Sequence, residues 1–305
     1  MRHGHHGRCK TYHTDNETYQ PNIEYRTRQS GEKEFYMVNA RHIIEALENR
    51  GYKASEKLVD KNGVTLHGLI LENGETVRPT VYLDDFDDED EAVEEIVKIF
   101  ERPLPTVNIG EIARPENLRI AIANKGNAGT DLTREFLDLE AYVYCNVGEF
   151  GGGFGSFKVS KANVKAFGLS EDELFKVAGL NSKGETKAQT LYEVLTEMMG
   201  GRTEFLFGLE DDDRMWVLSN ASKYRGASAM LDTETLESVA SKVDSDLLVL
   251  PSSIHEVIVV PASMGDARDF AEMVRDINRT EVEAVDRLSD TVYHFNRATK
   301  ELTIA

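Results

Sequence analysis

Short extended segments joined by Asn-Gly turns constrain the fold of this chain most strongly. Three such segments cover residues 52–59, 64–71 and 77–83, and the dipeptides Asn62-Gly63 and Asn73-Gly74 separate them. Asn-Gly is a strong signal for a tight hairpin, because both residues adopt positive φ readily. The sequence therefore predicts an antiparallel three-stranded meander.

Helices are expected on both sides of this meander. Apolar residues recur at helical spacing over residues 36–50, and again behind an acidic run that follows the third strand. The prolines at positions 103 and 105 end the second helix, since proline cannot continue one. We therefore expect an N-terminal subdomain over residues 35–105, preceded by a flexible, His-rich arm over residues 1–34.

Residues 106–305 alternate irregularly between strand and helix patterns. Strands are expected at 118–123, 139–147, 203–208, 215–220, 227–231, 247–250, 255–260, 292–295 and 302–304. Helices are expected before Gly168, behind a capping box at Ser170–Glu173, over 187–199, behind Asp232 or Thr233, and over 266–278. Closely spaced strands imply antiparallel pairing. We therefore predict an α+β protein, with an N-terminal antiparallel meander with helices and a larger mixed C-terminal subdomain, rather than doubly wound α/β.

The chain is strongly acidic. Among its 305 residues, 54 Asp and Glu oppose 35 Lys and Arg, which gives a formal net charge of −19. Such a chain is repelled by nucleic-acid phosphates and attracted by basic surfaces. We therefore expect no direct nucleic-acid binding, and we expect the partner to be a basic protein surface.

Other features of the composition bear on location. No apolar run approaches the ~18 residues of a membrane-spanning helix, and the first twenty residues lack the apolar stretch of a secretion signal. The two cysteines, Cys9 and Cys145, are too few for a disulfide scaffold and suggest a reducing compartment. We expect a cytoplasmic protein that does not enter membranes.

The acidic run is the first candidate binding site. Its members are Asp84, Asp85, Asp87, Asp88, Glu89, Asp90 and Glu91. Carboxylates of this density suit a basic partner, or a calcium or magnesium ion, but the run does not meet the EF-hand spacing. The alternative is a solvated helix start, where carboxylates stabilise the positive end of the helix. The smaller cluster Asp211–Asp213 is interpreted as a solvated turn.

The N-terminal arm contains potential metal ligands. They are His3, His5, His6, Cys9 and His13. Imidazole and thiolate groups bind zinc, copper and nickel, but the spacing matches no structural zinc pattern. We therefore expect a passive arm, no metal site and no cofactor.

A glycine-rich stretch, Gly151–Gly155, has the composition of a phosphate-binding loop. It is not followed by the Gly-Lys-Ser/Thr sequence that a P-loop requires. We interpret it as a hairpin turn or hinge rather than a nucleotide site.

A second candidate site combines hydroxyl, imidazole and carboxylate groups. Its members are Ser252, Ser253, His255 and Glu256, with Asp290 as a more distant carboxylate. Ser–His hydrolases need an imidazole that bonds a hydroxyl and is oriented by an acid. The Gly-x-Ser-x-Gly elbow is absent, although Gly226–Met230 comes close to it. The alternative is a polar turn in which these side chains satisfy backbone groups.

Four stretches of the C-terminal half occur together in an order that resembles a bacterial domain family of unknown function. They are residues 216–220, 226–231, 250–257 and 288–293, and the signature Leu-Pro-Ser-Ser-Ile-His-Glu lies in the third. Residues 63–69, 78–83 and 167–174 fit the same family, which is found mainly in gut anaerobes and mobile elements. The resemblance covers about residues 36–297. It implies no reaction, only a bacterial or phage origin, an intracellular setting and an accessory role.

Two functions are carried forward. The leading hypothesis is an intracellular accessory protein that binds another macromolecule. One form of it is a phage or mobile-element protein that inhibits a nucleic-acid-binding host protein. The alternative is a Ser–His hydrolase centred on Ser252, Ser253 and His255. The oligomeric state stays open.

Overall fold

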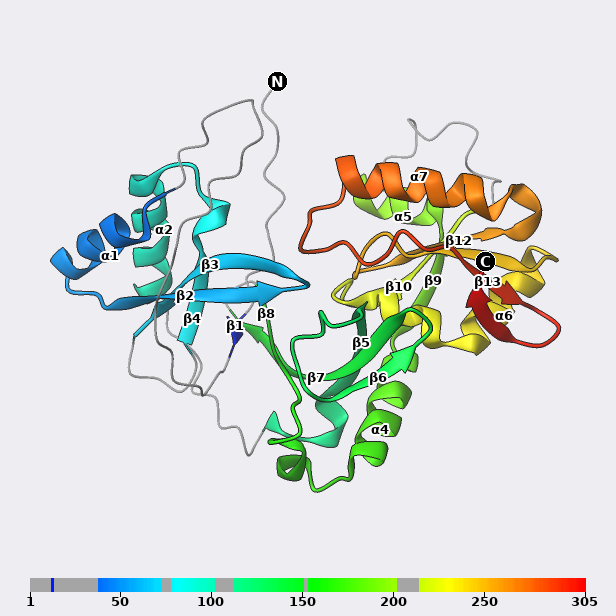
Figure 1. Ribbon diagram of the computed structural model, residues 1–305, viewed down its shortest axis with the longest axis horizontal. Helices are drawn as coiled ribbons and strands as arrows, with labels where there is room; N and C mark the ends of the chain where they lie inside the picture. Colours follow the sequence, from blue (N-terminus) through cyan, green and yellow to red (C-terminus); the bar gives the residue numbers. More distant parts are fainter. Residues whose placement is uncertain (1–11, 14–37, 73–77, 102–111, 151–152, 202–213) are drawn as a thin grey trace. The chain divides into compact units, whose positions relative to one another are not determined.

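The computed structural model describes residues 12–13, 38–72, 78–101, 112–150, 153–201 and 214–305 (Figure 1). The protein is a mixed α+β protein, as the sequence predicts. It divides into two compact units. The first comprises Met1–Asp60, Thr65–Ile112 and Asn146–Phe157, and the second comprises Lys61–Val64, Ala113–Cys145 and Lys158–Ala305. The boundary expected near residue 105 stays a prediction.

The predicted meander forms in the first unit. Its strands are β2 (Ala54–Lys61), β3 (Val64–Leu71) and β4 (Arg78–Tyr82), and they are neighbours in that order. β3 and β4 pair antiparallel, with Gly68 opposite Tyr82. Two further short strands extend the sheet: β1 (Tyr12–His13) pairs with β4, and also with β8 (Gly153–Lys158). Apart from β1, the predicted arm lies outside the described residues.

Two helices supply the core of this unit. They are α1 (Ala40–Asn49) and α2 (Glu89–Glu101), which follows the short helix η1 (Leu83–Asp85). Asn39 caps α1, because its side chain accepts the Arg41 N–H at 3.0 Å. The buried faces of the helices and of the meander form one cluster that includes Ile43, Leu47, Leu69, Leu71, Ala92, Val93, Ile96 and Ile99. Full burial of a side chain such as Leu47 contributes roughly 1.5–3 kcal/mol. α2 is therefore held to the unit by its apolar face.

A sheet of six strands forms most of the second unit. They are β9 (Thr186–Thr190), β10 (Trp216–Asn220), β11 (Leu247–Leu250), β12 (Val257–Pro261), β13 (Tyr293–Asn296) and β14 (Glu301–Ile304). Their order is β14-β13-β11-β12-β10-β9, and every pairing is antiparallel. The last hairpin, β13–β14, was predicted and is confirmed.

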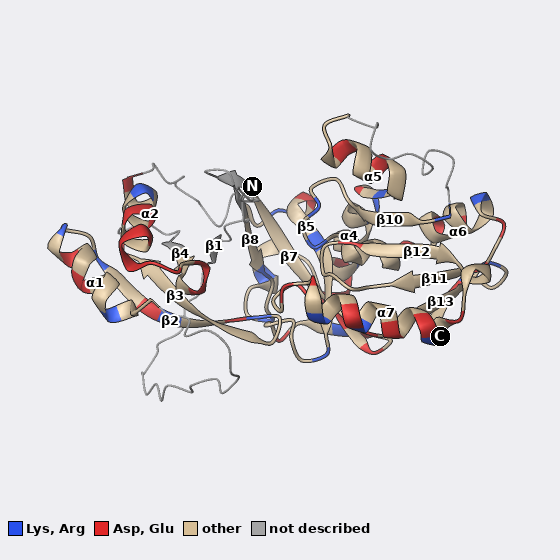
Figure 2. Cartoon of the chain, turned by 90° about the horizontal axis from the view of Figure 1, so that it is seen from above, with Lys and Arg blue, Asp and Glu red and all other residues tan. Residues whose placement is uncertain are grey.

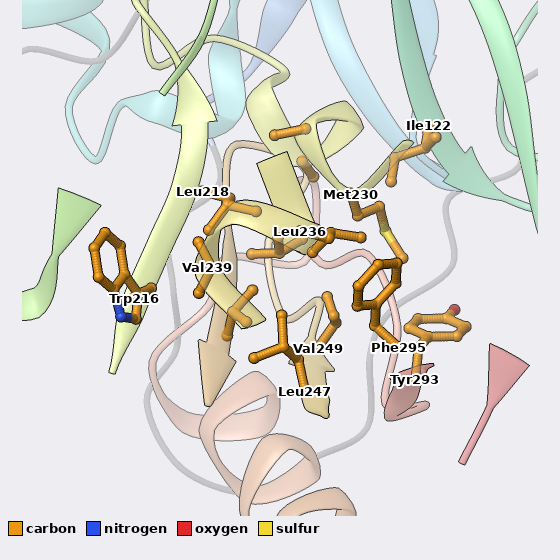
Figure 3. Close-up of a cluster of buried hydrophobic side chains, with 14 of the residues drawn as sticks. Ile122, Trp216, Leu218, Met230, Leu236, Val239, Leu247, Val249, Tyr293 and Phe295 are labelled. Carbon is orange, nitrogen blue, oxygen red and sulfur yellow. The ribbon is translucent and has the colours of Figure 1, made fainter. Parts of the chain in front are cut away.

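Helices cover both faces of this sheet. On one face, α6 (Thr233–Lys242) and η4 (Gly226–Leu231) pack on side chains of β10, β11 and β13, as Figure 3 shows for Leu236, Val239 and Met230. On the other face, α7 (Ala267–Thr280) packs through Val274 against Leu248 and Val260. A further helix, α5 (Leu191–Met198), follows β9 directly.

Three further antiparallel strands belong to this part of the fold. They are β5 (Leu118–Asn124), β6 (Thr133–Phe136) and β7 (Leu139–Phe150), and both β5 and β6 pair with β7. One face of the β5–β7 pair joins the core of the unit through Ile122 and Ala141, while the other carries Tyr142 and Tyr144. Around it lie the short helices η2 (Pro115–Asn117) and η3 (Val164–Phe167), and the longer helix α4 (Glu171–Lys183).

The predicted helix caps are confirmed. Ser170 and Glu173 form a reciprocal capping box at the start of α4, in which Glu173 Oε2 accepts the Ser170 N–H at 2.9 Å. Asp232 caps α6 by accepting the N–H groups of Glu234 and Thr235. These caps involve residues two or three positions apart, which is why the sequence alone indicates them.

Two local predictions are wrong. Residues 227–231 were expected to be extended, but they form the 3-10 helix η4, which the chain enters through the left-handed backbone of Arg225 at φ 54°. The helix expected from Lys187 starts only at Leu191, because residues 186–190 pair with β10 as strand β9. The strand predicted at 203–208 lies outside the described residues. In the described ranges, every helix is too short or too polar to cross a membrane.

Candidate functional site

The acidic run lies on η1 and the start of α2, and part of it stabilises the fold. Asp84 Oδ2 accepts the His67 N–H at 2.7 Å. Asp88 Oδ1 accepts the Glu91 N–H at 2.8 Å, and Glu89 Oε1 accepts the Asn39 N–H at 2.9 Å. Three of the seven candidate carboxylates therefore satisfy backbone donors at a helix start or a neighbouring strand, as the alternative interpretation of the run expects.

The other four candidates, Asp85, Asp87, Asp90 and Glu91, are exposed. The surface they belong to extends along α2. We call residues Asp84–Glu101 the acidic segment: it contains ten carboxylates and one lysine, a formal charge of −9 out of −19 for the chain. Figure 2 shows the positions of Asp and Glu, in red, along α2. Nearly half of the excess negative charge is thus concentrated on one continuous segment that comprises most of η1 and all of α2.

No metal site accompanies this charge in the part of the chain that the structure describes. Groups of three or more His, Cys, Asp or Glu side chains arranged to hold an ion are absent from it. The candidate ligands His3, His5, His6 and Cys9 lie outside the described residues, and only the backbone of His13 lies inside them. Asp211–Asp213 and the glycines at 151 and 152 also lie outside.

The second candidate site is a polar cluster around His255, which four separate segments build. The loop before β12 pairs with residues 286–289: the Ile254 N–H donates to Asp286 O at 2.8 Å, and the Leu288 N–H donates to Ser252 O at 3.1 Å. Ser253 and Arg287 form an isolated antiparallel bridge between them. His255 is therefore held by a rigid, strand-like backbone pairing.

The end of β10 and the start of η4 close the cluster from the other side. Ser219 Oγ donates to the His255 carbonyl at 2.7 Å, and the Ala227 N–H donates to Ile254 O at 3.1 Å. Gly226 lies against these groups, and a Cβ placed on it would come within 2.5 Å of His255 O. Only glycine allows this close approach of η4 to the loop.

Both ring nitrogens of His255 are engaged. Nδ1 accepts the Arg225 N–H at 3.3 Å, and Nε2 lies 3.2 Å from Asp286 Oδ1. Because the Nδ1 atom is an acceptor, the neutral ring carries its proton on Nε2 and donates it to the carboxylate. The His255 side chain retains 26% of its exposure, so the pair lies near the surface.

Arg225 connects the cluster to the pair of strands formed by β5 and β7. Its backbone is left-handed, with φ 54°, and its buried guanidinium donates to the Tyr142 hydroxyl at 2.7 Å. The guanidinium also faces the rings of Tyr144 and Tyr224 at 5.2 and 5.0 Å. Burial opposes the charge, but the three phenol groups outweigh it and raise the pKa of Arg225. The group therefore stays protonated and stabilises the fold as a buried cation on aromatic faces.

The comparisons with known proteins add a family. Residues 32–297 match the model of a family described as "Family of unknown function (DUF5688)". The chain belongs to this family. No curated protein and no solved structure matches the chain. The family description names no activity, and the bacterial or phage origin and the intracellular setting stay predictions.

The structure brings only part of the predicted catalytic set together in this family member. Ser253 is buried, and its Oγ accepts the backbone N–H of His255 at 3.0 Å rather than bonding the ring. Ser252 and Glu256 are half-buried. Asp290 Oδ1 accepts the Asn278 side-chain N–H at 2.7 Å and not a proton of His255.

Sequence reasoning missed the acid that orients the imidazole. That acid is Asp286, which the pairing of residues 286–289 with the loop places beside His255. With Asp286 on Nε2 and a backbone N–H on Nδ1, no ring nitrogen is left to accept a proton from a serine. The geometry therefore corresponds to the polar-turn interpretation and gives a Ser–His mechanism no support.

Proposed function

We propose that this protein is an accessory protein that binds a basic protein surface through the acidic segment. The observation that carries the proposal is the concentration of a formal charge of −9 on Asp84–Glu101. Charge concentrated on one segment produces a local electrostatic potential that steers an oppositely charged partner. The potentials of evenly mixed positive and negative charges cancel instead.

The position of α2 also favours binding. Its apolar side, which includes Ala92, Val93 and Ile96, is buried in the core of the first unit. Exposed carboxylates such as Asp90 and Glu91 are therefore presented by a helix that is already ordered. Less conformational entropy is lost on binding than for a disordered acidic tail.

One form of this function is inhibition of a nucleic-acid-binding protein. In that form the carboxylates of the acidic segment take the place of phosphates in the partner's basic groove. Duplex DNA then competes with this protein for the partner, and rising salt weakens the complex.

Two triple variants with the same change in charge test the proposal. The first, D87N/D90N/E91Q, neutralises exposed carboxylates of the acidic segment. The matched control, D269N/E272Q/E301Q, neutralises exposed carboxylates of the second unit. The full-length chain is immobilised, basic proteins captured from bacterial lysate at low salt are purified, and the affinity of each is measured against all three forms.

We expect the first variant to lose about tenfold or more in affinity, because several charge contacts are removed together, and the control to stay within about twofold of the parent. The proposal is wrong if no basic protein is captured, or if the two variants lose affinity equally. Competition by duplex DNA distinguishes the inhibitor form from other basic partners.

The hydrolase alternative is not proposed. His255 and Asp286 form a pair, but no described hydroxyl is bonded to the ring, and both ring nitrogens already have partners. A nucleophile and its base must be within hydrogen-bond reach of each other.

A further inference from the structure

One outer edge of the six-stranded sheet is open. β14 is the last strand in the sheet order, and its partner is β13. The Ala305 N–H donates to the Val292 carbonyl at 3.0 Å. Because hydrogen-bonded pairs recur at every second residue of an antiparallel ladder, Thr303 also bonds β13, whereas the N–H and C=O groups of Leu302 and Ile304 point away from it. Within the described part of the chain, no group pairs with these outward donors and acceptors.

The other outer strands of the two sheets carry features that protect a free edge. Lys57 lies on β2, Arg134 on β6 and Lys187 on β9. On β5, the Ile120 N–H donates to Ser182 Oγ at 2.9 Å. β14 has neither a lysine nor a proline, and its register with β13 runs without a bulge. An edge without such features is a template on which another strand can pair.

The side chains of β14 extend the apolar core towards this edge. Leu302 is partly buried and packs against the core of the second unit. Side chains two residues apart project from the same face of a strand, so Ile304 lies on the same face as Leu302. Ile304 is 52% exposed. The edge therefore combines unpaired backbone groups with apolar surface that a second strand would cover.

The hairpin that carries β14, drawn in red in Figure 1, is held in place by hydrogen bonds. In its turn, Asn296 Oδ1 accepts the N–H groups of Ala298 and Thr299 at 2.9 and 3.0 Å. The Arg297 N–H donates to Asp246 Oδ1 at 3.0 Å, which ties the turn to the segment before β11. Because the edge is ordered in advance, little conformational entropy is lost when a strand adds to it.

We propose that β14 is the interface of a symmetric homodimer, in which two copies of this chain join their six-stranded sheets edge to edge. A twofold axis beside Thr303 places Leu302 opposite Ile304 of the partner subunit. Each outward N–H then meets an outward carbonyl of the other copy, and the two apolar side chains come into contact.

The edge is self-complementary, which favours a second copy over another protein. In the register about Thr303, Glu301 lies opposite Ala305 of the partner subunit, so like charges do not face each other. A second copy always brings the same unpaired groups in the matching order, as a twofold interface requires. This interface is separate from the acidic segment and does not depend on the function proposed for it.

Sedimentation equilibrium of the full-length chain from about 1 to 200 µM tests the proposal. The variant I304K places a charge at the open edge. A second variant, I304P, removes an outward N–H and keeps the bonds between β14 and β13, since proline is tolerated where an edge N–H faces solvent. The matched control is L180K, which makes the same change in charge at Leu180, an apolar residue of α4 that is 61% exposed. Continued protection of the Thr303 amide in hydrogen exchange shows that the hairpin is intact in each variant.

We expect the parent chain and L180K to approach twice the monomer mass of 34.2 kDa as concentration rises. I304K and I304P should each weaken the dimer by about tenfold or more. The amides of Leu302 and Ile304 should become protected as the dimer forms. Because a net charge of −19 opposes self-association, rising salt should strengthen the dimer, whereas it weakens the complex proposed for the acidic segment.

Three results would overturn the proposal. The first is a parent chain that keeps the monomer mass at every concentration. The second is a dimer that forms without any change in the exchange of Leu302 and Ile304. The third is a dimer that L180K weakens as much as I304K does, or that I304K leaves as strong as in the parent chain.

Discussion

Replacing Gly226 by alanine tests how tightly the His255 cluster is packed. A Cβ at this position would lie 2.5 Å from His255 O and 2.7 Å from Asn220 N, and it would also overlap Ser219 Oγ. Two of these atoms belong to the backbone of separate segments and cannot rotate away. The substitution must therefore push η4 from the loop before β12, which lengthens the bond from Ser219 Oγ to the His255 carbonyl.

The magnitude follows from two effects. Overpacking a rigid site costs about 1–3 kcal/mol, and losing one hydrogen bond costs about 0.5–1.5 kcal/mol. Their sum predicts that G226A lowers the free energy of unfolding by about 1.5–4.5 kcal/mol. The matched control is Gly179→Ala: Gly179 lies within α4, and a Cβ there meets no atom within 4 Å. The same substitution should stabilise the protein at that position by about 0.5–1 kcal/mol, because alanine favours the helix.

Urea unfolding followed by tryptophan fluorescence measures both effects. Trp216 is the single tryptophan of the chain, it is 5% exposed, and it lies on β10, the strand that carries Ser219. With a slope of about 2 kcal/mol per molar urea, G226A should shift the midpoint down by about 0.75–2.25 M. A midpoint within about 0.25 M of the parent chain would refute the close approach of η4 and the loop.

Two further predictions concern titratable side chains. Because the Arg225 N–H donates to Nδ1 of His255, the neutral ring should carry its proton on Nε2, and long-range proton–nitrogen spectra of the neutral form should show this tautomer; an Nδ1–H signal from the neutral ring would contradict the assignment. Burial raises the pKa of the Cys145 thiol to about 12. The unfolded thiol ionises near pH 9 while the folded one stays protonated, so its contribution to stability is present below pH 9 and is lost between pH 9 and 12. In a Cys9→Ser chain, the free energy of unfolding should therefore fall with pH more steeply than in the same chain with Cys145→Ala, by at most about 1.4 kcal/mol per pH unit; parallel curves would exclude the shift.

Local signals explain what the sequence predicted well. The Asn-Gly turn of the meander and the capping box of Ser170 and Glu173 depend on residues that are adjacent or three positions apart. The apolar spacing of α2 likewise depends on one segment. Each of these features is stabilised by its own residues, so the pattern and the structure agree.

The His255 cluster depends instead on distant parts of the chain. Its two ring partners, Arg225 and Asp286, are 30 and 31 residues from His255. Which carboxylate reaches the ring is decided by the register of residues 286–289 against the loop, and a shift by a few residues would present Asp290 instead. Sequence spacing carries no information about that register, so Asp290 was named and Asp286 was missed.

The strand β9 was missed for a related reason. Residues 187–190 have neither a regular alternation of apolar residues nor a turn before the helix that follows them. They become a strand because β10 offers a free edge with which residues 186–190 pair. Pairing with a distant strand overrides local propensity here.

Hydrogen exchange of the complex with a captured basic protein tests the central claim most directly. If the acidic segment is the binding surface, backbone amides of Asp84–Glu101 should become protected when the partner binds, and the D87N/D90N/E91Q variant should lose that protection. Protection confined to the second unit, with the exchange of Asp84–Glu101 unchanged, would contradict it.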